Sequence, residues 1–131
     1  MAREKDRRSS EQRKTREGSQ MPHLKESTTG TTTTSSYVLA QQTRTIGFTK
    51  ISVLVTNSDG TNSIKYKILG SNDPQGGTNT FAEDVSEQTL TAGSAARHVL
   101  SGPFVWIQVQ VKDASGGSHG IANVYLLAVG L

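Results

Sequence analysis

Three histidines are the side chains best suited to catalysis or metal binding, and they lie far apart in the sequence. His23 is near the N-terminus, His98 lies in an Ala-Ala-Arg-His-Val-Leu segment, and His119 lies in a Gly/Ser-rich loop. A catalytic triad or a metal site needs two or more such groups to converge with acids. The sequence leaves convergence of His98 and His119 open, but it favours histidines on the surface.

The densest acidic cluster consists of Glu83, Asp84 and Glu87. Paired carboxylates perform acid–base chemistry when their surroundings push their pKa values apart. Loop-like residues flank these three, so we expect solvated charges. The sequence contains no cysteine, which excludes disulfides, thiolate zinc ligands and thiol catalysis.

Two glycine-containing segments fail as ligand-binding loops. An EF-hand that began at Asn57 would need a Glu at its twelfth position, where this sequence has Ile68. Segment 70–78 is rich in glycine, but it lacks the Lys of a phosphate-binding loop and opens no helix. We therefore predict that the chain is not an enzyme and holds neither a metal nor a cofactor.

The N-terminal region carries all of the net charge. Residues 1–26 contain eight Lys/Arg and five Asp/Glu, a net of +3, whereas the remaining residues contain six of each. This region lacks the apolar core of a secretory signal, and no run in the sequence has the length of a membrane span. We predict a basic, flexible arm over residues 1–26 and no membrane association.

The charges of the arm bear on its partner. Arginine and lysine neutralise phosphates, but interspersed acids and the lack of aromatic residues for base stacking favour a protein surface over nucleic acid. A merely solvated arm is the remaining alternative. The residues that we expect to contact a partner protein are Arg3, Arg7, Arg8, Arg13, Lys14 and Arg16.

Residues 27–36 consist only of Ser, Thr and Gly, a composition typical of a linker, or of an extended strap if its backbone finds hydrogen-bond partners. From Tyr37 onward the apolar period becomes two, which predicts strands in a domain over residues 37–131. The side chains that we expect to face the core are Ile51, Val53, Val55, Ile64, Tyr66, Ile68, Val105, Ile107, Val109 and Val111.

The last segment, 121–129, is apolar on both faces, which predicts a central strand or one buried in an oligomer contact. Turn residues separate the strands: Asp59-Gly60 is typical of a hairpin, and segments 72–77, 92–94 and 113–117 are predicted loops. Short strands at this spacing indicate an all-β fold, an antiparallel β-sandwich or jelly roll.

A Thr/Gly/Asn-rich β-domain behind a polar arm resembles small structural proteins of tailed bacteriophages, namely capsid decoration (cement) proteins and neck or tail accessory proteins. The resemblance implies a non-enzymatic virion protein that is assembled in the host cytoplasm, forms a homo-oligomer, and contacts the major capsid or other virion proteins through its arm. A head–tail neck or tail adaptor is the alternative within this group.

Segments 64–73 and 106–111 also resemble strands of discoidin-like and other carbohydrate-binding sandwiches, so a carbohydrate-binding module is a further alternative. Sugar sites use exposed aromatic side chains for stacking. Trp106 is the candidate because it lies on the face opposite Val105 and Ile107. Burial of Trp106 on a second face is the competing interpretation.

Overall fold

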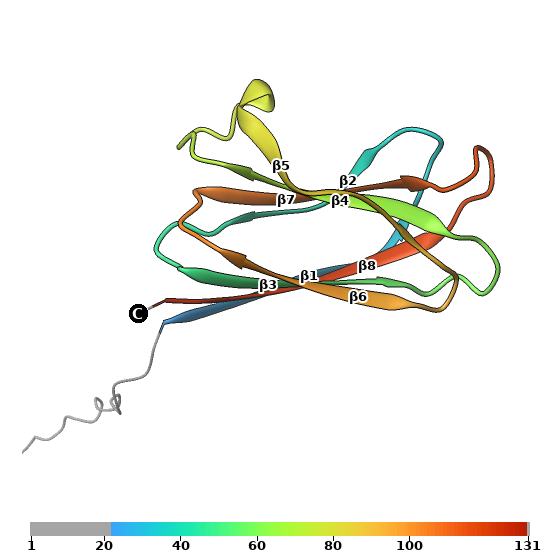
Figure 1. Ribbon diagram of the computed structural model, residues 1–131, viewed down its shortest axis with the longest axis horizontal. Helices are drawn as coiled ribbons and strands as arrows, with labels where there is room; N and C mark the ends of the chain where they lie inside the picture. Colours follow the sequence, from blue (N-terminus) through green and yellow to red (C-terminus); the bar gives the residue numbers. More distant parts are fainter. Residues whose placement is uncertain (1–21, 131) are drawn as a thin grey trace, which may run out of the picture.

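The computed structural model describes residues 22–130, which form eight β-strands and a short 3-10 helix (Figure 1). In chain order the elements are β1 (His23–Thr32), β2 (Val38–Arg44), β3 (Lys50–Asn57), β4 (Ile64–Ser71), η3 (Thr78–Thr80), β5 (Phe81–Leu90), β6 (Ala95–Ser101), β7 (Trp106–Asp113) and β8 (Ile121–Val129). Within this range no helix has the length and apolar character needed to cross a membrane.

The strands form two antiparallel sheets that pack face to face, which confirms the predicted β-sandwich (Figure 1). The first sheet has the order β1-β8-β3-β6 and the second sheet the order β2-β7-β4-β5. The pairing is nested, because β1 pairs with β8, β2 with β7, β3 with β6, and β4 with β5. The first half of the chain therefore runs against the second half and rolls up with it, as in a jelly roll.

The core lies between the two sheets and follows the predicted alternation. The inward side chains of β3 and β4 are fully buried, apart from a 2% exposure of Tyr66: Ile51, Val53, Val55, Ile64, Tyr66 and Ile68. On β7 the buried residues are Ile107, Val109 and Val111. Val105 is only half-buried, because it precedes β7 where the chain enters the sheet.

Strand β8 is central, as its two apolar faces predict. It lies between β1 and β3 in the first sheet and pairs with both. Its inward side chains, including Val124 and Leu126, are buried in the core, whereas Tyr125 and Leu127 point outward and are 42% exposed.

The predicted domain boundaries need correction at the N-terminal side. Residues 27–32, predicted as part of a linker, belong to β1, and β1 also takes in residues 23–26 of the predicted arm. The extended-strap alternative holds for residues 27–32, because β8 pairs with them on both sides of an irregularity between Thr28 and Thr31 and Thr is a good strand residue. Thr33 is fully buried beyond the strand end. The sandwich therefore begins at His23, and residues 1–21 lie outside the described residues.

The predicted hairpin at Asp59-Gly60 is wrong. β3 belongs to the first sheet and β4 to the second, so the intervening segment crosses between the sheets. Gly60 does not have the positive φ that a tight hairpin turn requires. Instead, the Asn57 side chain donates to the Asn62 carbonyl at 2.8 Å, and the Asp59 carboxylate accepts from the Asn62 amide at 2.6 Å. These local bonds build a turn without joining adjacent strands.

Candidate interaction face

Trp106 is half-buried rather than fully exposed. It opens β7 on the outer side of the second sheet, and its Nε1 donates to the Pro74 carbonyl at 3.4 Å. A Cβ on Gly76 would lie 3.1 Å from the same nitrogen, so the loop after β4 covers part of the indole. The stacking surface that a sugar would need is therefore reduced. The basic residues predicted to contact a partner lie outside the described residues: Arg3, Arg7, Arg8, Arg13, Lys14 and Arg16.

The histidines have separate partners. The Nε2 atom of His98 lies 2.7 Å from the Tyr66 hydroxyl, at the margin of the core. His119 Nδ1 lies 3.0 Å from a carboxylate oxygen of Asp113. Over residues 22–130, no group of three or more His, Asp or Glu side chains is arranged to hold a metal ion. The two histidines therefore contribute to two different polar contacts and do not form a common site.

Asp113 is the most elaborately bonded acid of the described chain. Its carboxylate, which is buried, accepts hydrogen bonds from Thr33 Oγ1 at 2.6 Å and from the Gly117 amide at 3.3 Å, in addition to the contact with His119. Burial by itself raises the pKa of Asp113, but these hydrogen bonds and the His119 ring outweigh it and hold the pKa below its usual value. The network ties β1 to the end of β7, so its role is structural.

The acidic cluster lies on β5, with its members exposed as expected. Glu83 pairs with Lys67 at 3.4 Å, and Glu87 pairs with Lys65 at 3.1 Å. Asp84 has no ion pair among residues 22–130, and partial burial raises its pKa. Two of the three carboxylates are thus engaged by lysines of the neighbouring strand β4, and the cluster forms no acid–base pair.

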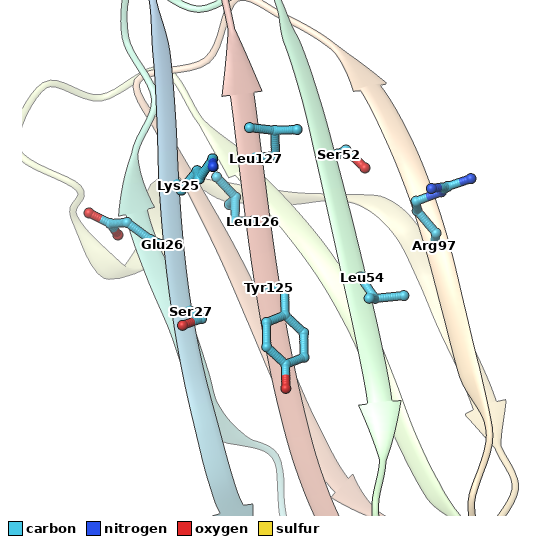
Figure 2. A pocket seen from close by; sticks show the side chains of 9 residues that line it. All are labelled: Lys25, Glu26, Ser27, Ser52, Leu54, Arg97, Tyr125, Leu126 and Leu127. Carbon is cyan, nitrogen blue, oxygen red and sulfur yellow. The ribbon is translucent and has the colours of Figure 1, made fainter.

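The most distinctive surface is the outward side of the first sheet, shown in Figure 2. Cross-strand pairing aligns two rows of outward side chains over all four strands. One row runs Lys25, Leu127, Ser52 and Val99, and the other runs Ser27, Tyr125, Leu54 and Arg97. We call these eight residues the first-sheet face. Its centre is apolar, and its two cations stand at diagonally opposite corners, on the edge strands β1 and β6.

The first-sheet face is open to solvent and slightly hollow. Val99 is 62% exposed, and Tyr125 and Leu127 are also substantially exposed. A groove of about 450 Å³ runs over Ser27, Leu54, Tyr125 and Leu127 between the two cations. Uncovered apolar clusters with a polar rim are typical of interaction sites.

The first sheet carries a net positive charge. The strands of the first sheet contain three Lys/Arg residues, Lys25, Lys50 and Arg97, and one carboxylate, Glu26. Glu26 is directed to the second sheet, where it accepts a hydrogen bond from Thr43 Oγ1 at 2.8 Å. Among the described residues no carboxylate lies within ion-pair distance of the three cations. Glu26 borders the groove but forms no ion pair with the cations, so the first-sheet face presents a net positive charge over the described residues.

Sequence reasoning missed this face, because its members are alternate residues of four strands whose neighbours depend on register. Two signals were nevertheless present: the outward apolar residues of 121–129, and the absence of acids from segments 50–57, 95–101 and 121–129.

Comparisons with known proteins support the fold but identify no sequence family. No protein-family model matches the chain, and no curated protein matches its sequence. Among solved structures, a Bacillus endospore appendage protein of disulfide-linked pili is similar, with TM-score 0.52 and 13% identity over 86% of this chain and 93% of that one.

Two further structures show the same degree of likeness. PirA has a TM-score of 0.53 and 11% identity over 79% of this chain and 92% of that one. The K3 cleaved adhesin domain of Lys-gingipain from Porphyromonas gingivalis w83 has a TM-score of 0.51 and 14% identity, covering 70% of this chain and 63% of that one. At such identities the likeness establishes the fold alone: the chain is similar to these proteins in having an antiparallel β-sandwich.

Proposed function

We propose that this chain is a non-enzymatic structural protein of a virus particle, of the capsid decoration type, that binds an assembled shell. The observation that carries the proposal is the uncovered first-sheet face, where Val99, Tyr125 and Leu127 are exposed and the cations have no ion-pair partner over residues 22–130. Exposed apolar area does not stabilise an isolated domain. In a component of an assembly, docking buries that area and stabilises the assembled state.

The fold supports the proposal without deciding it. Jelly rolls form viral capsid domains and also lectin domains, and a fold by itself does not specify function. A pilus protein and an adhesin domain share the sandwich, which is compatible with a structural or adhesive role. The partial cover over Trp106 makes the lectin alternative weaker, because a sugar-stacking ring needs a free surface.

The arm provides a second contact in this proposal. Residues 1–21 carry seven Lys/Arg and four Asp/Glu, and they precede β1, the edge strand that contributes Lys25 to the first-sheet face. The arm and the face are therefore adjacent in the chain, so a shell subunit could engage both at once. Two linked contacts give an avidity above that of either contact alone.

Quantitative mass spectrometry of purified particles tests the proposal. We expect the chain at a fixed stoichiometry in the particles, and purified chain should bind particles that lack it. Hundreds of copies per particle, in proportion to the shell subunits, support the decoration role. About a dozen copies or fewer, enough for a single ring, indicate a neck or tail adaptor. Absence from the particles would contradict the proposal.

The role of the arm is tested with a full-length variant in which Arg3, Arg7, Arg8, Arg13, Lys14 and Arg16 are replaced by Gln. We expect particle binding to weaken by about tenfold or more, because the substitution removes charge complementarity. The melting temperature should not change, since β1–β8 are intact. Unchanged particle binding would show that the arm is not a docking element.

A further inference from the structure

We infer that the first-sheet face binds an acidic amphipathic segment of another protein, with apolar side chains over Leu54, Tyr125 and Leu127 and carboxylates at Lys25 and Arg97. The inference rests on the proposed function only for where that segment comes from, namely a shell subunit. The chemistry of the segment follows from the face itself.

The centre of the face requires an apolar partner. Tyr125 and Leu127 are exposed on β8 and Val99 is exposed on β6, with Ser52 and Leu54 of β3 between them. The groove of about 450 Å³ over Leu54, Tyr125 and Leu127 gives side chains a place to insert. Burial of such area stabilises a complex by about 25 cal/mol per Å² before the costs of association are subtracted.

Charge disfavours the two occupants that the chain itself could supply. A second copy placed face to face would bring six cations to the interface, Lys25, Lys50 and Arg97 from each copy, with Glu26 as the one carboxylate that each first sheet contributes. The chain's own residues 1–21 have a net charge of +3 and few apolar side chains. Like charges across an interface are strongly unfavourable. The occupant is therefore a different protein, and it carries acids.

Nucleic acid and membrane fit the face less well. Phosphates would satisfy Lys25 and Arg97, but they would leave Leu54 and Leu127 uncovered, and Tyr125 is the only aromatic residue of the face available for base stacking. A flat bilayer surface would not fill the groove. A protein segment satisfies both the charges and the groove.

The geometry also sets the spacing of the acids. Lys25 and Arg97 are three strand spacings apart across the sheet and one row apart along it, which places their Cα atoms roughly 16 Å apart for ordinary sheet dimensions. That distance equals about eleven residues of an α-helix, or three turns, so both acids would lie on the same helix face. We expect a helical segment with this spacing to bind well.

Selection from a random peptide library tests the inference. The probes are peptides of about sixteen residues, long enough to span the two cations as a helix, and the target is the full chain. We expect the enriched peptides to combine apolar residues with two or more Asp or Glu. Their affinity should fall with added salt, because the charges are solvent-accessible. Substitution of the acids by Gln in the best peptide should weaken its binding.

Matched variants locate the binding site. In the double variant Lys25→Glu/Arg97→Glu, selected peptides should bind at least about tenfold more weakly, because attraction becomes repulsion. Leu127→Thr should also weaken binding. The controls on the second sheet, Arg44→Glu and Leu39→Thr, alter an exposed cation and an exposed apolar residue of the other side and should leave binding unchanged.

Three results would overturn the inference: enrichment of basic or uncharged peptides, no enrichment at all, or binding unaffected by the face variants. Vesicles with anionic phosphatidylglycerol and a single-stranded oligonucleotide are run in parallel; binding to either that the double variant abolishes assigns the face to that ligand instead. The particle experiment is independent of the peptide selection. If acidic peptides are selected but the chain is absent from particles, the inference about the first-sheet face stands and the virion role is rejected.

Discussion

The strands of the two sheets follow the same alternation of inward and outward residues, yet the outward side chains of the two sheets differ in how their charges are paired. On the second sheet the charges of β4 and β5 are largely satisfied locally: Lys65 and Lys67 pair with Glu87 and Glu83, and the Tyr37 hydroxyl donates to Glu87 at 2.5 Å. On the first sheet the cations have no such partners among the described residues. The alternation of inward and outward residues therefore does not predict whether the charges on the outer side of a sheet are paired within the same sheet.

The side chains between the charges show the same contrast. The second sheet carries an amide ladder, in which Gln108 donates to Gln42 at 2.9 Å and Gln110 donates to Gln108 at 2.6 Å. The first sheet carries Leu54, Tyr125 and Leu127 at the corresponding central positions. The centre of the second sheet is bridged by amide hydrogen bonds, with Leu39 exposed toward its margin, whereas the centre of the first sheet offers apolar area. This difference is the reason for proposing the first sheet as the docking side.

The largest effect is expected from removing β1, the edge strand of the first sheet. A chain that begins at residue 37, the boundary suggested by composition, lacks the β1–β8 ladder and the Thr33–Asp113 bond. We expect it to lose most of the ~5–15 kcal/mol that stabilises a domain and to unfold without cooperativity by circular dichroism. A chain that begins at residue 22 should melt as the full chain does; equal melting of both would refute the assignment of β1.

A smaller effect is expected in the shared core. Ile107→Ala should lower the free energy of unfolding by about 2–5 kcal/mol, because the side chain is fully buried and leaves a cavity. Its outward neighbour Gln108→Ala should cost about 1 kcal/mol or less, since only an exposed amide contact is lost. Urea denaturation measures both changes. Similar costs would mean that β7 is inverted relative to the structure.

The acid dependence of stability should report on Asp113. Its pKa is lower in the folded chain than in the unfolded one, so its stabilisation is present above the ordinary value of about 4 and is lost as the pH falls below it. Asp113→Asn should therefore be less stable than the parent chain at neutral pH, and the two stability curves should converge in acid. A difference that does not depend on pH would exclude the carboxylate as its source.

The smallest effects should come from single charge reversals on the two outer sides. Lys67→Glu breaks the pair with Glu83 and should cost about 0.2–1 kcal/mol, decreasing with salt. Arg97→Glu breaks no pair among the described residues and should change stability by no more than about 0.5 kcal/mol. Thermal melts at low and high salt measure both. A larger cost for Arg97→Glu would mean that Arg97 serves the fold rather than a partner.

Local patterns were sufficient for much of the sandwich. The alternation of Ile51, Val53 and Val55 predicted a half-buried strand, and the doubly apolar segment 121–129 predicted a central one; both are confirmed. Composition failed at residues 27–32, because an edge strand takes its hydrogen bonds from its neighbour and needs few apolar side chains. It also failed at Asp59-Gly60, since a turn signal does not reveal which sheet receives the next strand.

The sequence by itself determined the fold class, the inward residues of the main strands, the lack of thiol chemistry and the basic character of the N-terminal region, because each depends on residue type or on a short period. Only the tertiary structure decided which strands became neighbours. Nested pairing brings Lys25, Tyr125, Leu54 and Arg97 together from four strands. The physical reason is that cross-strand contact depends on register and sheet order, which arise from packing the whole core at once.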